Sequence, residues 1–146
     1  MFFGNGTVDP IVGIEASYAF EAFRLASWAN VRAPLYENRF GYQGPTQITG
    51  GLGVDTGFGL ETWRFLLQPE IYHETPATWA GEPARNSGRT DLIAAAGVYW
   101  LPSADWTVHL LAKVPWTVRA EGGQLRMPFV GLLGVTYAFN LWQPSP

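Results

Sequence analysis

The sequence contains no cysteine, few charged residues and no long apolar run. Because none of its 146 residues is Cys, the chain has neither a disulfide framework nor a thiolate metal site. Charged residues make up 14% of the sequence, against about a quarter in ordinary soluble domains. No stretch approaches the roughly 18 apolar residues of a membrane-spanning helix. The net charge of −3 offers no basic face, so we expect no nucleic-acid partner.

The sequence does contain a clear two-residue alternation of apolar and polar side chains. Helical periodicity is weak, and Gly and β-branched residues run through the apolar segments, which favours strands. Successive side chains of a strand point to opposite faces, so Trp63, Phe65 and Leu67 share one face, whereas Arg64 and Glu70 share the other. The alternation predicts seven strands, at roughly residues 10–20, 23–35, 46–58, 62–73, 90–101, 106–118 and 127–139.

Every charged residue of these strands falls on the same row of side chains, and the opposite row has no charge. A sheet with one uncharged face is expected where that face contacts lipid. The alternative is a soluble barrel or sandwich whose core is the uncharged row, but a soluble exterior carries many Lys and Glu, and the opposite row is sparse and Gly-rich. We therefore expect a barrel lumen lined by Glu15, Arg24, Asn30, Arg32, Asp55, Arg64, Gln68, Glu70, Asp91, His109 and Lys113.

The connections between the predicted strands alternate between short and long. Residues 21–22, 59–61 and 102–105 form tight turns, whereas the intervening loops are long and rich in Gly and Pro. Short turns at one end and long loops at the other are typical of outer-membrane barrels. Aromatic residues of the uncharged row border the short turns, as in the girdle at a membrane interface: Tyr18, Phe20, Phe23, Phe58, Trp63, Trp100, Trp106, Tyr137 and Phe139.

Several segments resemble bacterial outer-membrane β-barrel proteins of the MetA-pathway phenol degradation (putative transporter) type. The resemblance is carried by Asp9-Pro10-Ile11-Val12-Gly13, Asn86-Ser87-Gly88, Gly97-Val98-Tyr99-Trp100, Lys113-Val114-Pro115-Trp116, Gly122-Gly123-Gln124-Leu125 and Gly134-Val135-Thr136-Tyr137-Ala138-Phe139. It implies passage of small hydrophobic or aromatic solutes, with no catalytic motif and no cofactor. Gly134, Tyr137 and Phe139 also match the C-terminal signal that outer-membrane insertion machinery reads, although Leu133 stands where a polar residue is usual.

The expected fold class is all-β, an antiparallel up-and-down meander of about seven or eight strands. It forms one domain over residues 1–146 that is a transmembrane β-barrel or a segment of one. With short turns in the periplasm, the first and last of seven strands both descend, which leaves the start of the first strand outside the cell. Such a barrel cannot close in the ordinary way, because bacterial barrels have an even strand number. We therefore expect the domain to be incomplete on its N-terminal side and completed by strands of the same or other chains.

The charges of the lumen row allow two interpretations. They either pair into a network that fills a narrow lumen or form a polar pore lining that sets solute preference. Arg24 and Arg32 are expected to face Glu15 or Asp55, and Arg64 to face Asp55. The histidines are interpreted as ordinary polar lining, because two isolated His residues do not make a metal site.

The sequence thus predicts a non-enzymatic channel or transporter-like barrel in the bacterial outer membrane. The alternative is a structural or assembly component with a plugged lumen and partner-binding outer loops. A third hypothesis, a lipid-modifying enzyme, requires His73 and the loop residue Ser87 to lie within hydrogen-bond reach.

Overall fold

The computed structural model describes residues 6–120, 122 and 127–139, and this part of the chain contains strands but no helix. Its strands are β1 (Ile11–Ala19), β2 (Arg24–Arg32), β3 (Tyr42–Gln43), β4 (Gln47–Thr56), β5 (Trp63–Glu74), β6 (Thr78–Trp79), β7 (Glu82–Pro83), β8 (Arg89–Trp100), β9 (Trp106–Ala120) and β10 (Val130–Tyr137).

Seven of these strands form one antiparallel sheet in the order β1-β2-β4-β5-β8-β9-β10. Each strand pairs with the next long strand of the chain, so the predicted up-and-down meander of seven strands is confirmed. No observed strand end differs from its predicted position by more than three residues. Alternation locates these strands well because each is long enough to repeat the pattern several times.

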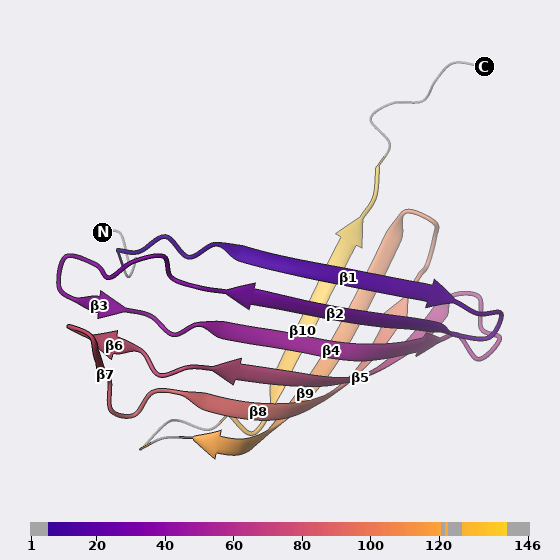
Figure 1. The fold of residues 1–146 in the computed structure, drawn as a ribbon. Coiled ribbons are helices and arrows are strands. Elements are labelled where there is room, and N and C mark those ends of the chain that lie inside the picture. Colours follow the sequence, from indigo (N-terminus) through magenta and orange to yellow (C-terminus); the bar gives the residue numbers. More distant parts are fainter. Residues whose placement is uncertain (1–5, 121, 123–126, 140–146) are drawn as a thin grey trace.

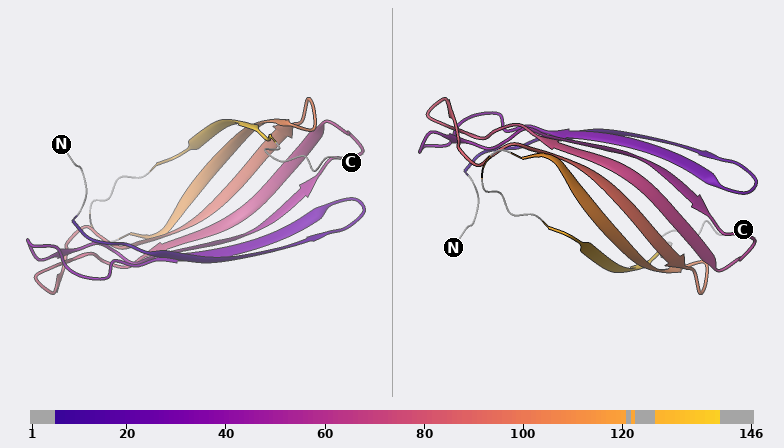
Figure 2. Two further views of the ribbon diagram at one scale, coloured as in Figure 1. Left: turned by 90° about the horizontal axis from the view of Figure 1, so that it is seen from above. Right: turned by 90° about the horizontal axis from the view of Figure 1, so that it is seen from below.

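The large sheet is strongly curved but open. Figure 1 shows β9 and β10 turned back behind β1, β2 and β4, and Figure 2 shows the resulting trough from above and below. Among the described residues, β1 pairs only with β2 and β10 only with β9, so the sheet does not close into a barrel. The expectation that these seven strands cannot close by themselves agrees with this open edge.

Small residues on the inner side of the trough make room for large neighbours. A Cβ atom added to Gly134 would lie 2.3 Å from the His109 ring, and one added to Gly51 would lie 3.0 Å from Trp28 Nε1. The register between β8 and β9 also shifts at Thr90 and Asp91, where a bulge strengthens the local twist and bend. The Gly-rich polar row is therefore the row that lets the sheet curve.

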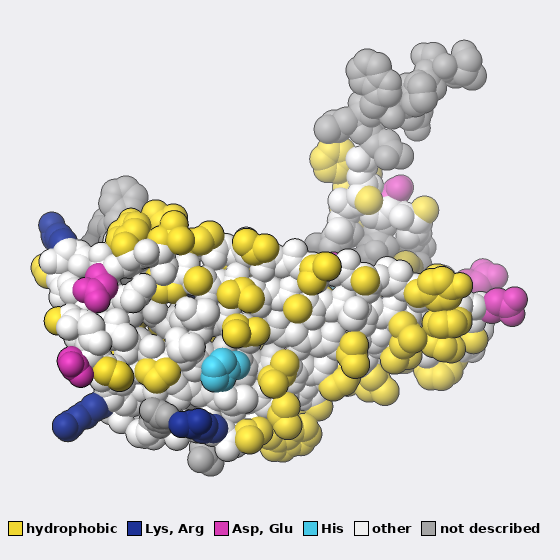
Figure 3. Space-filling view, in the orientation of Figure 1, with side chains coloured by type: hydrophobic (Ala, Val, Ile, Leu, Met, Phe, Trp, Pro, Cys, Tyr) yellow, Lys and Arg dark blue, Asp and Glu magenta, His cyan; other side chains and the backbone are white. Residues whose placement is uncertain are grey.

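The sheet is polar inside and apolar outside. We call the polar row of side chains the concave face and the uncharged row the convex face. Leu67 on the convex face is 66% exposed and Leu133 is 77% exposed, whereas Glu70 on the concave face is only 8% exposed. Among the described hydrophobic residues, only Ala77 and Ala95 are buried. In Figure 3, hydrophobic side chains spread over the outer surface, and the charged ones lie toward the strand ends.

A second, three-stranded sheet, β3-β6-β7, was not predicted, because its residues fall in the long loops between the main strands. Its strands have two residues each, too few to repeat an alternation. Ala80 and Gly81 both have positive φ, 50° and 81°, which is the geometry of a tight hairpin between β6 and β7. The rings of Tyr42 and Trp79 pack 5.0 Å apart across β3 and β6. The long loops at this end of the large sheet are therefore held together by a small sheet of their own.

Candidate functional site on the concave face of the sheet

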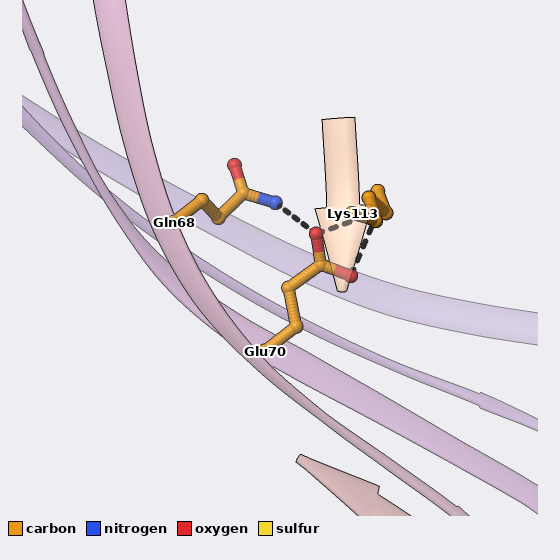
Figure 4. A network of polar contacts seen from close by, with 3 residues as sticks. All are labelled: Gln68, Glu70 and Lys113. Atoms are coloured by element: carbon orange, nitrogen blue, oxygen red, sulfur yellow. Dashed lines mark hydrogen bonds and ion pairs between the residues drawn. The ribbon is translucent and has the colours of Figure 1, made fainter. Parts of the chain in front are cut away.

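An ion pair crosses the middle of the concave face. Lys113 Nζ of β9 lies 2.6 Å from Oε1 and 2.8 Å from Oε2 of Glu70 on β5, and Gln68 Nε2 donates to Oε1 at 2.8 Å (Figure 4). The lysine side chain spans β8, where Ala95 lies opposite both Gln68 and Lys113 in the register. Ala95 is small enough to be covered, and it is 3% exposed. Two strands that are not neighbours are thus joined through their inner side chains.

At the short-turn end of the concave face, a second ion pair joins neighbouring strands. Arg24 Nε lies 2.6 Å from Asp55 Oδ2, and the two residues are directly opposite in the β2–β4 register. This pair lines a cavity of about 510 Å³ together with Arg64, Tyr99 and other residues of the short-turn end. Among the described residues, Arg64 forms no ion pair. Glu21 also lines this cavity, so its lining carries two positive and two negative side chains.

At the loop end, two further ion pairs hold the rim of the trough. Arg89 Nη2 lies 2.5 Å from Asp91 Oδ2, and Arg32 Nη2 lies 2.6 Å from Asp9 Oδ2. The Asp91 carboxylate is buried, with a side chain that is 6% exposed, and its Oδ1 atom has no hydrogen-bond partner among the described residues. The buried carboxylate sits at the bulge between β8 and β9.

The structure confirms one of the predicted pairings and corrects two. Arg24 pairs with Asp55 as expected. Arg32 was expected to face Glu15 or Asp55 but pairs with Asp9, because the register places it at the loop end of β2, opposite Ile11 and Gln47. The expected pair between Arg64 and Asp55 does not form. Asp55 Oδ2 is paired with Arg24, and the residue opposite Asp55 on β5 is Leu66.

The other predicted lining residues lie beside polar or aromatic side chains. The Thr49 hydroxyl donates to Asn30 Oδ1 across β2 and β4. The His109 ring packs 5.5 Å from the Tyr99 ring, on the same face as Gly134. Among the described residues Glu15 forms no ion pair, and Trp28 lies opposite it in the register. Sequence reasoning missed Asp9 and Arg89, which lie just beyond the alternating segments that reveal the strands.

The residues predicted to form an aromatic girdle lie in a band at the short-turn end of the convex face, where their rings meet in separate groups. All nine residues are exposed. Ring contacts join Tyr18, Phe20 and Phe23 at 4.8 and 4.6 Å, and Trp106 and Tyr137 at 4.8 Å. Further contacts follow along the band, namely Phe58 with Phe65, Trp63 with Trp100, and Tyr137 with Phe139. Cross-strand register therefore brings together side chains that are far apart in the sequence.

The catalytic pairing that was considered does not form among the described residues. His73 Nδ1 lies 2.9 Å from the Thr90 hydroxyl. The Ser87 hydroxyl donates to the Ala84 carbonyl at 2.6 Å and accepts from the Ala77 amide at 3.1 Å, so it stabilises its own loop. Within the described part of the chain, no group of three or more His, Cys, Asp or Glu residues is placed to hold a metal ion.

Comparisons with protein-family models, with curated proteins and with solved structures found no match to this chain. Over the described residues, no helix is long and apolar enough to cross a membrane.

Removing one member of the central ion pair tests its role in stability. We expect Lys113→Met to lower the free energy of unfolding by about 3–5 kcal/mol, because it leaves the Glu70 carboxylate buried without its cation. Arg24→Met, at a pair whose arginine is 57% exposed, is the matched control and costs at most about 1 kcal/mol. The double variant Glu70→Gln/Lys113→Met regains most of the loss. Urea titration measures the free energy of unfolding of each variant. Equal losses in Lys113→Met and Arg24→Met contradict the expectation.

Proposed function

We propose that this chain forms a segment of a β-barrel in the bacterial outer membrane, with its convex face against lipid and its concave face toward the lumen. The distribution of burial carries this proposal. Large apolar side chains such as Ile14, Leu52 and Leu67 are more than 60% exposed, whereas the Glu70 and Asp91 side chains are buried. Exposed apolar side chains and buried charges are unfavourable for a protein in water, because exposed apolar area is costly there. The same arrangement is favourable when the apolar face contacts hydrocarbon.

The aromatic band and the two kinds of connection support the same orientation. Trp and Tyr rings are enriched where hydrocarbon meets headgroups, and here they gather beside the short turns. Short turns are periplasmic in outer-membrane barrels, so the loop end, with β3, β6 and β7, faces the outside of the cell. In this orientation β10 descends toward the periplasm, where the insertion machinery would read Tyr137 at its end and Phe139 just beyond it.

In this proposal the concave face is the wall of a pathway for small solutes, and hydrophobic or aromatic solutes follow from the family resemblance. The chain supplies charges of both signs to that wall, and Arg64, at the short-turn end, forms no ion pair with any residue that the structure describes. A polar lining of this kind sets which solutes enter. No chemical step is assigned to the chain.

A plugged, structural barrel is the second candidate, and the central ion pair favours it. Because Lys113 reaches across β8 to Glu70, side chains occupy part of the space inside the trough. A lumen filled by such contacts is typical of barrels with about eight strands. The chain would then serve assembly, with its outer loops as the binding surface.

A charged substitution on the convex face tests the membrane proposal. We expect Leu67→Arg, near the middle of β5, to lower stability in phospholipid vesicles by about 2–4 kcal/mol, because the charge enters hydrocarbon. A similarly exposed leucine of a soluble protein would change by no more than about 0.5 kcal/mol.

Gln68→Arg is the matched control for this substitution, since it places the same charge on the adjacent residue but beside the Glu70 carboxylate. It should be tolerated. The proposal fails if both variants unfold at the same urea concentration in vesicles, or if the unmodified chain does not associate with vesicles.

Water access to the middle of the concave face separates the channel from the plugged barrel. We expect Gln68→Cys, in vesicles, to react with a charged water-soluble thiol reagent at a rate comparable to that of the exposed reference Ser17→Cys. The absence of native cysteines makes the reaction site unambiguous. Strong protection that disappears when Lys113→Ala is added would favour the plugged barrel instead.

A further inference from the structure

A row of three polar side chains crosses the concave face at the short-turn end. Arg64 on β5, Tyr99 on β8 and His109 on β9 lie directly opposite one another in the register of adjacent strands. Gly134 on β10 continues the row, and its missing side chain makes room for the His109 ring. The register thus places a guanidinium, a phenol and an imidazole side by side on three strands.

These three side chains have hydrogen-bonding groups that no other described residue uses. Arg64, Tyr99 and His109 form neither an ion pair nor a side-chain hydrogen bond within the described part of the chain. The Tyr99 and His109 rings pack together, with centroids 5.5 Å apart. In the middle of the same face, by contrast, Lys113 is held by both carboxylate oxygens of Glu70. The donors of the Arg64 row are therefore open to a ligand.

A row of leucines lies beside this polar row, one step toward the middle of the face. Leu66 of β5 is opposite Gly97 of β8, Gly97 is opposite Leu111 of β9, and Leu132 of β10 continues the row. A Cβ atom added to Gly97 would lie 2.9 Å from Leu111 Cδ1 and 3.7 Å from Leu66 Cβ, so the two leucines flank the space above the glycine. Rows two residues apart on one face are about 7 Å apart. A cationic row and an apolar row thus lie within the length of one small molecule.

The charges of the neighbouring cavity restrict what can bind there. Arg64 and Leu66 line the cavity of about 510 Å³ together with Arg24, Asp55 and Glu21. Arg24 is already paired with Asp55, so one guanidinium is left to receive an anion. A guanidinium matches a planar carboxylate with two parallel hydrogen bonds. A doubly charged anion such as phosphate is less suitable, because Glu21 lies in the same cavity and repels negative charge.

We propose that this part of the concave face binds an organic monocarboxylate, with its carboxylate at Arg64 and Tyr99 and its apolar body along Leu66 and Leu111. The inference rests on the proposed function and narrows its solutes to singly charged acids with an apolar body. Arg64 pairs with the carboxylate oxygens, and the Tyr99 hydroxyl donates a further hydrogen bond. The body crosses two strand spacings from β5 to β9, about 10 Å. Octanoate is therefore a suitable probe.

Binding of octanoate to the chain in phosphatidylcholine vesicles tests the role of Arg64. Equilibrium dialysis with radiolabelled octanoate, corrected for vesicles without protein, measures the affinity. We expect Arg64→Met to weaken binding at least about tenfold, because a charge-assisted pair is lost. Arg64→Lys, which keeps the charge but not the planar fork, should weaken it about threefold. Arg39→Met, at an exposed arginine of the loop before β3, is the matched control and should bind octanoate as the unmodified chain does. Unchanged affinity in Arg64→Met, or an equal loss in Arg39→Met, overturns the proposal.

Glu21→Gln tests the same position without removing a contact. The Glu21 carboxylate repels an anion at Arg64, so we expect this variant to bind octanoate about threefold more tightly. Glu21 is exposed in the turn between β1 and β2, and its substitution should leave the fold intact. Unchanged or weaker binding contradicts the assigned position of the carboxylate.

A series of ligands tests the apolar part of the site. Butanoate, hexanoate and octanoate should bind at least about fivefold more tightly with each two-carbon extension, because more apolar area is buried on the leucines. 1-Octanol, which has the same chain without the charge, should bind equally to the unmodified chain and to Arg64→Met. Equal affinities for the three acids, or an octanol affinity that falls as much as that of octanoate, overturn the proposal.

Flotation of the same vesicles separates this inference from the proposed function. A chain that does not float with the vesicles contradicts the membrane function. A chain that floats but binds octanoate no better than Arg64→Met contradicts the carboxylate site alone.

Discussion

The structure depends on the two-residue period of a β-strand. Because successive side chains point to opposite faces, one alternating pattern repeated over seven strands produces two chemically different surfaces. The convex surface is apolar and exposed, with Leu67 and Leu133 among its most exposed residues, and the concave surface holds the ion pairs. A one-residue slip in register would exchange the faces of a strand, so the contrast between them fixes the register as well.

Charge and curvature support each other on the concave face. Glycine and alanine there let the sheet bend, and bending brings Lys113 of β9 over Ala95 to Glu70 of β5. That contact in turn joins strands on the two sides of β8. Side chains of the apolar face diverge as the sheet curves, which is why few of them bury each other. The contacts that hold the described trough together are therefore mainly its backbone ladder and its inner ion pairs, because few apolar side chains are buried.

Repetition explains how much of this could be predicted from the sequence. Long strands such as β5 repeat the alternation several times, so their faces and ends follow from the residues alone. Ion-pair partners depend on register, which is a relation between strands. The pairing of Arg24 with Asp55 was predicted correctly. Arg32 instead pairs with Asp9, a residue that lies outside the alternating segments. The small β3-β6-β7 sheet left no periodic signal, and the degree of curvature depends on side-chain volumes across several strands at once.

The claim that the convex face contacts lipid is tested most directly by a spin-label scan of β5. Single cysteines at each residue from 63 to 74 would carry a nitroxide in vesicles, and its collisions with oxygen and with a water-soluble nickel complex would be measured. Oxygen partitions into hydrocarbon, so we predict oxygen accessibility with a two-residue period, low at Arg64, Leu66, Gln68 and Glu70 and high at Trp63, Phe65, Leu67 and Ile71. Labels at these four positions that collide mainly with the nickel complex, or an accessibility without this period, would contradict the account.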